Sequence, residues 1–457
     1  MAVVRRVPLA LAILLALGVA LRILFMLAYR PALLGYPDTS VYLTGATGDL
    51  FWDPLRVVGY PAFLRLVRVF SSDLSFATLV QHGLGVATAV LLYVTVRRIG
   101  GPRWVALVPA AVVLLGGDQL FFEHAILSES LFGLLVAGAL YAAVRVADGW
   151  WWAAAAGVLV GLCTTVRLAG LVLAPLLAAW LLARRPRLVP AAAATAATVL
   201  VVLGYLVAAH SETGVWSLAR NGAYNFYGRV APFADCSEFT PPAGTRALCQ
   251  RSRPFERPST QWYIFAGRSP AVRRFGEPQV GEPSRSAVRH VGAFARSAAL
   301  HQPLDLIEIA ARDFWRYVAP GSFRPYSPSP SVADYQRKLV EPQWIARSLQ
   351  LAGRRYSTRG TLVRHGLFAR LGDYERVTRI EGPPLAVLLV LALLAPLACP
   401  APLRRGALLL GGTAVALLVV PVLTHEYDGR FGVPAYGPLA GAAAFGALGL
   451  ARRVRAR

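Results

Sequence analysis

Long apolar runs, separated by short basic or polar segments, set the pattern of the chain. One crossing of a bilayer as an α-helix needs about 20 consecutive, mostly apolar residues. We count about ten runs near this length and therefore expect about ten transmembrane helices. The runs cover residues 7–28, 76–96, 104–116, 125–144, 150–165, 168–182, 188–209, 383–398, 406–423 and 431–450. This pattern predicts an all-α polytopic membrane protein.

One long polar segment interrupts the pattern between the seventh and eighth runs. Its first part is rich in proline, and residues 286–318 show the apolar period of amphipathic helix, which Pro303 interrupts. Residues 334–380 continue with a similar period. Such helices either lie on the membrane surface or form an ordinary small domain, and the sequence leaves both interpretations open.

We therefore divide the chain into three parts. Residues 1–209 form an N-terminal transmembrane module, in which residues 29–75 are the first outer loop. Residues 210–382 form a helix-rich loop domain, and residues 383–457 form a C-terminal transmembrane module.

The net charge of +23 would suit a nucleic-acid-binding protein, but its distribution argues against that function. Arginines fill the short segments between apolar runs, and Asp148 is the one acid among them. These segments are residues 5–6, 97–103, 145, 184–187, 404–405 and 452–457. This is the positive-inside pattern of cytoplasmic loops. We expect both termini in the cytoplasm and the loop domain outside it.

Basic residues also exceed acidic ones in the loop domain, although long translocated domains do not follow the positive-inside rule. The excess indicates either an anionic partner or a solvated basic face near anionic lipids, and both interpretations stay open. Lys338 is the only lysine among many arginines, which indicates a GC-rich genome. A bacterial plasma membrane is therefore the expected location.

The four cysteines fall into two classes. Cys163 and Cys399 lie in apolar runs and are expected to behave as small hydrophobic residues. Cys236 and Cys249 both lie in the loop domain. If that domain is extracytoplasmic, the two can form a disulfide that closes a short loop.

Polar residues that interrupt or flank the apolar runs gather at the ends that we expect outside the cytoplasm. Asp38 follows the first run, Glu129 lies near the start of the fourth, and Arg167 and Arg430 lie at outer turns. Charged residues in such places are costly and are usually functional. Further candidate substrate ligands are Tyr42, His82, Glu123, His124, Asn221, Tyr224, Arg229, His425 and Glu426. The other acids of the first outer loop, Asp49, Asp53 and Asp73, are interpreted as solvated.

Several short motifs at these positions resemble those of a known superfamily. The segments GYPD at residues 35–38 and VGYPAFL at residues 58–64 resemble the first outer loop of GT-C glycosyltransferases. These polyprenyl-phosphate-dependent enzymes include protein O-mannosyltransferases, the lipid A aminoarabinose transferase and actinobacterial arabinosyl- and mannosyltransferases. Later segments are also similar: VQHG (80–83), ILSESLF (126–132), TVRLAGL (165–171) and HEYDGRF (425–431). The resemblance covers residues 1–210 and 380–450, but Thr39 stands where many members have a second acid.

The resemblance implies a GT-C-type bundle and an inverting sugar transfer from a polyprenyl-phosphate donor. Asp38 would act as general base, and Arg430 and Arg167 would bind the donor phosphate. Glu129 would orient the acceptor, tune Asp38 or help to hold a divalent ion. The acceptor would be a cell-envelope glycan, a glycolipid or a protein, and an anionic one would match the basic loop domain. Nucleic acid is not an expected partner. No cofactor is required, and a divalent cation, Mg²⁺ or Mn²⁺, would be an optional addition.

Two other functions compete with this interpretation. A transporter or flippase of lipid-linked glycans should show broken helices at matching positions of two repeated halves, and no such repeat is evident in the sequence. A non-catalytic protein that binds envelope polymers would rely on the basic loop domain alone. Only the transferase requires residues 38, 167 and 430 to lie close together.

Overall fold

The computed structural model describes residues 8–183, 188–279, 283–320, 342–357 and 360–455. Helices form nearly all of its regular structure. In the described residues the one sheet pairs two short antiparallel strands, β1 (Tyr29–Arg30) and β2 (Leu362–Val363). The structure therefore confirms the predicted all-α fold.

A helix occupies every predicted apolar run. These helices are α1 (Leu9–Ala28), α4 (Leu74–Ile99), α5 (Arg103–Leu115) with α6 (Gly117–His124), α7 (Glu129–Val144), α8 (Trp151–Val166), η2 (Leu168–Val172) with α9 (Leu173–Leu182), α10 (Leu188–Thr213), α19 (Pro383–Ala398), α20 (Ala401–Thr424) and α21 (Gly429–Arg455). Among the described residues, six helices are long and apolar enough to cross a membrane, and α5 with α6 is a seventh candidate bent by 48°. The remaining three are apolar but shorter: α7, α8 and Leu168–Leu182.

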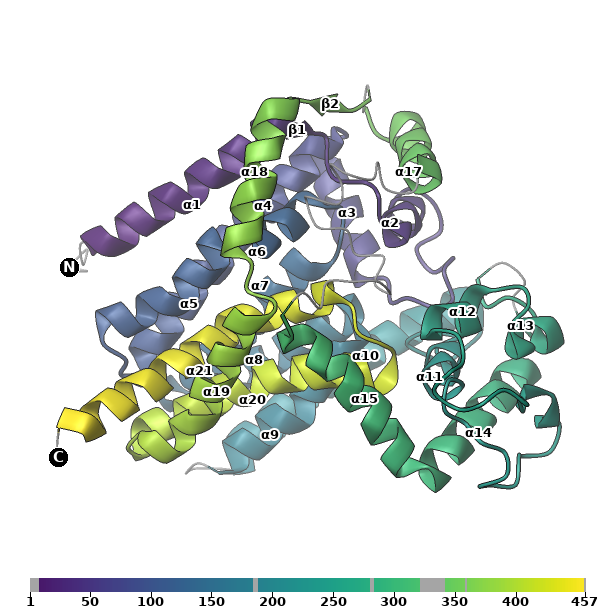
Figure 1. Ribbon diagram of the computed structural model, residues 1–457. Coiled ribbons are helices and arrows are strands. Elements are labelled where there is room, and N and C mark those ends of the chain that lie inside the picture. Colours follow the sequence, from purple (N-terminus) through teal and green to yellow (C-terminus); the bar gives the residue numbers. More distant parts are fainter. Residues whose placement is uncertain (1–7, 184–187, 280–282, 321–341, 358–359, 456–457) are drawn as a thin grey trace.

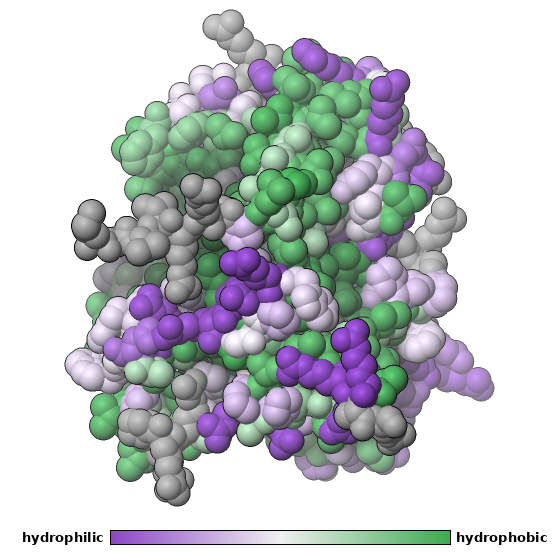
Figure 2. Space-filling model, turned by 90° about the vertical axis from the view of Figure 1, so that its left-hand side faces the viewer, coloured by the Kyte–Doolittle hydropathy of each residue, from purple (hydrophilic) through white to green (hydrophobic). Residues whose placement is uncertain are grey.

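The two ends of the bundle differ in character. The start of α1 and the end of α21 lie at one end, and the loop domain, from α11 (Ala223–Val230) to α14 (Arg285–His301), lies at the other (Figure 1). Figure 2 faces the end with the termini and shows hydrophilic side chains on a largely hydrophobic surface. Exposed arginines of these helix ends include Arg97, Arg98, Arg103, Arg404, Arg405, Arg452, Arg453 and Arg455.

Local sequence explains where α4 begins and ends. The Asp73 carboxylate accepts a hydrogen bond from the Ser75 amide at 2.9 Å, which caps the first turn. At the other end Gly100 adopts a φ of 104°, which favours glycine and stops the helix. Arg97 and Arg98 lie in the last turn, where the helix dipole favours cations.

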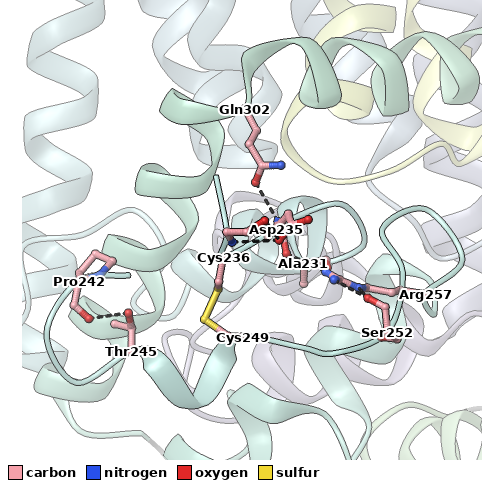
Figure 3. The surroundings of a disulfide bond; sticks show 11 residues. Ala231, Asp235, Cys236, Pro242, Thr245, Cys249, Ser252, Arg257 and Gln302 are labelled. Carbon is pink, nitrogen blue, oxygen red and sulfur yellow. Dashed lines mark hydrogen bonds between the residues drawn. A yellow bond between two sulfur atoms is a disulfide. The ribbon is translucent and has the colours of Figure 1, made fainter. Parts of the chain in front are cut away.

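The loop domain has a hydrophobic core of its own. α11, α12 (Thr260–Phe265), α13 (Pro270–Phe275) and α14 surround buried aromatic side chains, and the Tyr227 and Tyr263 rings meet edge-on at 6.0 Å. Cys236 and Cys249 are joined by a disulfide beside this core (Figure 3). Next to it the Arg257 guanidinium donates to two backbone carbonyls at 2.8 and 3.1 Å, which holds the loop around the disulfide.

Helix α15 (Pro303–Val318) connects this domain to the membrane helices. Pro303 separates it from α14, as the sequence predicts, because proline suits the first turn of a helix. α15 packs on α19 and α20 and crosses their ends (Figure 1). Its open face exposes Leu304, Ile307 and Trp315. Of the two open interpretations, α14 matches a small helical domain, and α15 has the apolar surface of a helix next to lipid.

The first outer loop contains two short helices, α2 (Pro37–Thr47) and α3 (Gly59–Phe70). The chain returns over this loop from the loop domain, because α17 (Pro342–Arg355) packs on α2 and α18 (His365–Thr378) packs on α6 and α1. The pairing of β1 with β2 ties the end of α1 to the start of α18. The predicted helix at residues 334–380 is thus two helices, and residues 321–341 lie outside the described part.

Candidate functional site

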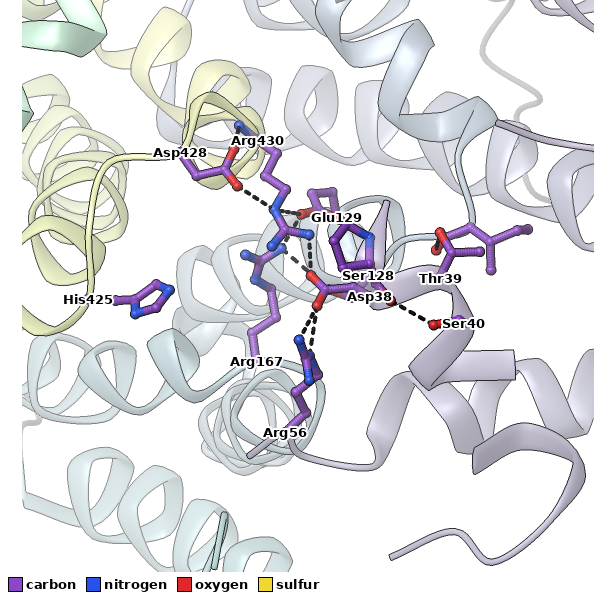
Figure 4. A network of polar contacts seen from close by, with 12 residues as sticks. Asp38, Thr39, Ser40, Arg56, Ser128, Glu129, Arg167, His425, Asp428 and Arg430 are labelled. Carbon is purple, nitrogen blue, oxygen red and sulfur yellow. Dashed lines mark hydrogen bonds and ion pairs between the residues drawn. The ribbon is translucent and has the colours of Figure 1, made fainter. Parts of the chain in front are cut away.

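Asp38 lies in the first turn of α2, directly after Pro37. Proline is favourable here because the first helical position needs no amide donor. Asp38 is buried, and its Oδ1 accepts from Arg56 Nε at 2.8 Å and lies 2.5 Å from Arg56 Nη2. Its Oδ2 lies 2.5 Å from Arg430 Nη1. Each carboxylate oxygen therefore faces a different guanidinium (Figure 4).

Arg430 lies in the first turn of α21 and is surrounded by acids. Asp428 accepts from the Arg430 amide at 3.2 Å and from its Nε at 2.8 Å. The same Nε lies 3.9 Å from Glu129 Oε1. The helix dipole opposes a cation at this end of a helix. Asp38, Asp428 and Glu129 offset that cost and hold Arg430 at the centre.

Arg167 follows the last residue of α8 and reaches the start of α7. Its Nη1 lies 2.5 Å from Glu129 Oε1 and donates to Ser128 Oγ at 3.3 Å. The Phe431 ring contacts both cations, with its centre 4.9 Å from the guanidinium carbon of Arg167 and 5.1 Å from that of Arg430. Asp38, Glu129, Arg167 and Arg430, which the sequence places on separate elements, thus form one cluster (Figure 4).

A glycine in the second motif allows this approach. A Cβ atom at Gly59 would lie 2.5 Å from the Thr165 carbonyl oxygen, closer than real Cβ contacts. The start of α3 therefore meets the end of α8 only because residue 59 lacks a side chain. This contact lies two residues before Arg167, so it helps to place that guanidinium.

Arg56 is a member of the cluster that the sequence does not single out. It lies between α2 and α3, and its Nη1 is 3.1 Å from Asp53 Oδ2. Asp53 is only 9% exposed, so its interpretation as a solvated loop residue is wrong. The only sequence signal for this ion pair is the spacing of three residues between Asp53 and Arg56. This signal is weak, because a loop has no regular period from which the direction of its side chains could be predicted.

The guanidiniums of the cluster are more accessible than its carboxylates. The side-chain exposures are 23% for Arg56, 16% for Arg167 and 15% for Arg430, against 9% for Asp38 and 1% for Glu129. A ligand that approaches the cluster therefore meets cations first. Burial alone would raise the pKa of Asp38, but the guanidiniums of Arg430 and Arg56 hold it well below its ordinary value.

Tyr42 lies one turn after Asp38 on α2. Its ring meets the Tyr60 ring edge-on, with centres 4.8 Å apart. Burial, and then the charge of Asp38, raise the pKa of Tyr42 to about 12. Its phenol therefore keeps its proton beside the cluster.

Three predicted ligands lie together in a polar network inside the bundle. The imidazole of His82 lies 3.0 Å from Glu123 Oε2 on one side and 3.0 Å from His124 Nδ1 on the other. Glu123 Oε1 is also 2.7 Å from Arg22 Nη2. All four side chains are buried and have partners within the protein. The role of His82, Glu123 and His124 in substrate binding stays a prediction.

Three more predicted ligands lie in the loop domain. Asn221 and Tyr224 donate to backbone carbonyls after α13, at 2.6 and 3.1 Å. Arg229 Nη1 lies 2.6 Å from Asp313 Oδ2 on α15. These buried contacts join α11 to its neighbours, and direct contact of the three with substrate stays a prediction.

His425 and Glu426 lie in the turn between α20 and α21 and contact the loop domain. The Gln261 amide nitrogen lies 2.7 Å from Glu426 Oε1 and 3.2 Å from His425 Nε2. In Figure 4 the His425 ring points toward the arginines of the cluster. Burial raises the pKa of Glu426 to about 7, and burial lowers that of His425 to about 4. This turn therefore contacts the loop domain and also contains Asp428 of the charged cluster.

A divalent cation needs several oxygen ligands that no other cation occupies. In the part of the chain that the structure describes, no group of three or more His, Cys, Asp or Glu side chains could hold a metal ion. Asp38, Asp53, Glu129 and Asp428 each face a guanidinium instead. The residues present therefore do not fit a divalent cation.

Comparison with known proteins gives similarity in structure only, because no family model and no curated protein matches the sequence. One similar structure is the S. cerevisiae protein O-mannosyltransferase Pmt1–Pmt2 complex bound to the sugar donor, with 18% identity and a TM-score of 0.34 over 50% of this chain. Another is the Archaeoglobus fulgidus oligosaccharyltransferase in the apo form, with 15% identity and a TM-score of 0.46 over 97%. ArnT from Cupriavidus metallidurans bound to undecaprenyl phosphate has 13% identity and a TM-score of 0.40 over 97%.

The chain spans 37% of the yeast chain, 51% of the archaeal chain and 78% of the ArnT chain. At these identities, function has to be inferred from the residues of the site. The likeness of the chain to these three proteins is one of structure.

Proposed function

We propose that the protein is a membrane glycosyltransferase that moves a sugar from a polyprenyl-phosphate donor to an extracytoplasmic acceptor. The observation that carries this proposal is the contact of a buried carboxylate, Asp38, with the guanidiniums of Arg430 and Arg56 at one end of the membrane helices. A carboxylate suits proton abstraction, and a guanidinium suits phosphate because it donates in pairs. Both chemistries meet in one cluster.

Asp38 is the proposed general base. In an inverting transfer the acceptor oxygen attacks the anomeric carbon, and the bond from that carbon to the phosphate oxygen breaks. The bonding electrons leave with the phosphate, and the acceptor proton passes to the carboxylate. Such a positioned base contributes typically about 10²–10⁴-fold to the rate. The departing phosphate already carries charge, so it needs cations rather than an acid.

Arg430 and Arg167 are the proposed phosphate ligands. Arg430 Nη1 now faces Asp38 Oδ2, so the donor phosphate has to replace that carboxylate oxygen. The replacement takes one cation away from Asp38, which raises its pKa toward the range of a useful base. Donor binding would therefore activate the base.

The charge balance of the cluster indicates that the lipid contributes to binding. Its guanidiniums already face carboxylates, so a phosphate alone finds no free cation. An apolar cavity opens between α7, α8, α9 and α20, and it is lined by Val136, Leu140, Leu177 and Leu409 among others. Val136 is about two turns along α7 from Glu129. An isoprenoid chain in this cavity would place its phosphate near the cluster.

The acceptor class and the location complete the proposal. Exposed arginines of the loop domain include Arg246, Arg251, Arg268, Arg273, Arg274 and Arg289. They favour an anionic envelope glycan, glycolipid or protein as acceptor. The exposed arginines at the opposite end of the bundle support a cytoplasmic position for both termini. The plasma membrane of a bacterium would then present the cluster and the loop domain to the cell envelope.

The experiment is to reconstitute the purified protein in liposomes with a panel of polyprenyl-phosphate-linked pentoses and hexoses and an envelope fraction. Mass spectrometry then follows the release of polyprenyl phosphate. Release by the wild type and not by Asp38→Asn supports the proposal. A flippase would instead move the intact donor across the bilayer without releasing polyprenyl phosphate, and that outcome, or no release from any donor, contradicts it.

A further inference from the structure

Residues 51–56 of the first outer loop are attached to the loop domain. The Arg220 guanidinium donates to the backbone carbonyls of residues 51 and 52 at 3.0 and 3.2 Å. The backbone amide of Asn221 donates to the Pro54 carbonyl at 2.8 Å. The Leu55 side chain is buried in the hydrophobic core of the loop domain. The loop domain thus determines where this segment of the membrane module lies.

Asp53 connects this attached segment to Arg56 and orients the Arg56 side chain. Asp53 Oδ1 accepts from the amides of residues 55 and 56 at 2.7 and 2.9 Å, which forms a tight turn. Asp53 Oδ2 lies 3.1 Å from Arg56 Nη1 and accepts from Gln279 of the loop domain at 3.0 Å. Backbone and side chain of Arg56 are therefore both fixed by one buried carboxylate.

Arg56 holds only one of the two oxygens of Asp38. Its Nε and Nη2 both contact Oδ1, at 2.8 and 2.5 Å, whereas Oδ2 faces Arg430. If the donor phosphate takes Arg430, Oδ1 stays anchored and Oδ2 becomes free for the acceptor hydroxyl. The division of the two oxygens between two arginines gives each arginine a separate task.

We propose that Arg56 and Asp53 are positioning residues through which the loop domain orients the Asp38 carboxylate for proton abstraction. The inference rests on the proposed function and adds a role for residues 53, 56 and 279. Arg56 acts through Asp38 and does not contact the reacting atoms. A purely structural role, in which Arg56 only ties down the loop, would lower the amount of folded protein without changing the chemistry of Asp38.

The pH dependence of turnover separates these roles. Burial raises the pKa of Asp38, and the charges of Arg430 and Arg56 lower it. Other charged or ionisable groups near Asp38 are Tyr42, Glu129, Arg167, Asp428 and His425. The Arg56 charge lowers the pKa of Tyr42, so in an Arg56 variant the Tyr42 phenol holds its proton more firmly and does not contribute to the acidic limb. Loss of one contacting cation raises a carboxyl pKa by about 1–3 units. The acidic limb of the pH profile of kcat should therefore move to higher pH by a similar amount when Arg56 is replaced.

The experiment compares Arg56→Ala, Arg56→Lys, Asp53→Asn and Asp49→Asn in the transfer assay. Asp49 is the matched control, because it accepts from the amide two residues later at 2.9 Å, as Asp53 does, but it is exposed and is not paired with Arg56 in the structure. kcat, the KM for donor, and the pH profile of kcat are measured per mole of folded protein.

We expect Arg56→Ala to lower kcat by roughly 10²-fold, the cost of a misplaced catalytic group, with little change in the KM for donor. Its acidic limb should move to higher pH, Arg56→Lys should restore the limb, and Asp53→Asn should lower kcat by roughly tenfold. Asp49→Asn should match the wild type. If Arg56→Ala does not fold, the lysine and Asp53 variants carry the test.

An unchanged pH profile in Arg56→Ala, or equal effects of Asp53→Asn and Asp49→Asn, would overturn this inference while the wild type still transfers sugar. Absence of transfer by the wild type would instead overturn the proposed function, so the two failures are distinguishable.

Discussion

Arg430 Nη1 lies 2.5 Å from Asp38 Oδ2, and this ion pair joins the last membrane helix to the first outer loop. The proposed phosphate ligand and the proposed base are therefore each other's partners. In the structure each of the two side chains is occupied by the other. The pair also explains why a buried carboxylate and a cation at a helix start can both stay charged.

Replacement of Arg430 should weaken donor binding more than it affects folding. A charge-assisted hydrogen bond contributes about 1.5–3 kcal/mol, so Arg430→Ala should weaken binding of polyprenyl phosphate by roughly 10–100-fold. Arg430→Lys should lose less, because it keeps the charge but not the paired donors. Binding is measured by titration of the purified protein in nanodiscs.

The matched control for this variant is Arg404→Ala, an exposed arginine at the opposite end of the bundle. It should bind polyprenyl phosphate as the wild type does. Equal losses in the two variants would indicate a general effect of membrane charge and would remove Arg430 as a specific ligand.

The turn between α20 and α21 should show two opposing pH dependences of stability. The pKa of Glu426 rises from 4.5 to about 7, so its contribution is full below pH 4.5 and is lost as the pH rises to 7. The pKa of His425 falls from 6.5 to about 4, so its contribution is full above pH 6.5 and is lost as the pH falls to 4. Between pH 4.5 and 6.5 the loss of stability from Glu426 and the gain of stability from His425 therefore cancel as the pH rises.

Single substitutions should expose each slope. In Glu426→Gln the unfolding temperature should rise with pH between about 4 and 6.5, and in His425→Gln it should fall between about 4.5 and 7. Both are measured by intrinsic fluorescence in detergent against Glu212→Gln, an exposed glutamate at the end of α10. A Glu426→Gln profile parallel to that of the wild type would refute the predicted coupling.

Turnover should not depend on a divalent cation. The carboxylates of the cluster face arginines rather than one another, so their oxygens are not arranged as a ligand set. We expect the same rate of transfer after treatment with EDTA and after addition of Mg²⁺ or Mn²⁺. A rate that disappears with EDTA and returns with either metal would show that an ion reorganises the cluster.

The membrane helices could be predicted from the sequence because their signal is local. An apolar run such as residues 188–209 requires a helix whatever its neighbours are, and α10 occupies it. The convergence of Asp38, Glu129, Arg167 and Arg430 also followed, because alternating crossings bring every second turn to the same end. Pro303 likewise marked the break between α14 and α15.

The contribution of Arg56 could not be predicted from the sequence in this way. Its position depends on the burial of Leu55 in a core built from residues that are far away in the chain. The sequence also does not show toward which neighbouring helix a polar side chain points. The sequence predicts that three polar residues lie on the same side of the membrane as the cluster: His82, Glu123 and His124. In the structure these side chains contact one another within the bundle.

The central claim is that Asp38 is the general base and that its ion pair with the phosphate-binding arginine keeps its basicity low until the donor phosphate binds. The most direct measurement compares Asp38→Asn with the wild type in two assays, turnover and binding of polyprenyl phosphate. Loss of the competing carboxylate charge should leave binding equal or tighter, while turnover falls by about 10²–10⁴-fold. Retained turnover, or a loss of binding that matches the loss of turnover, would contradict the account.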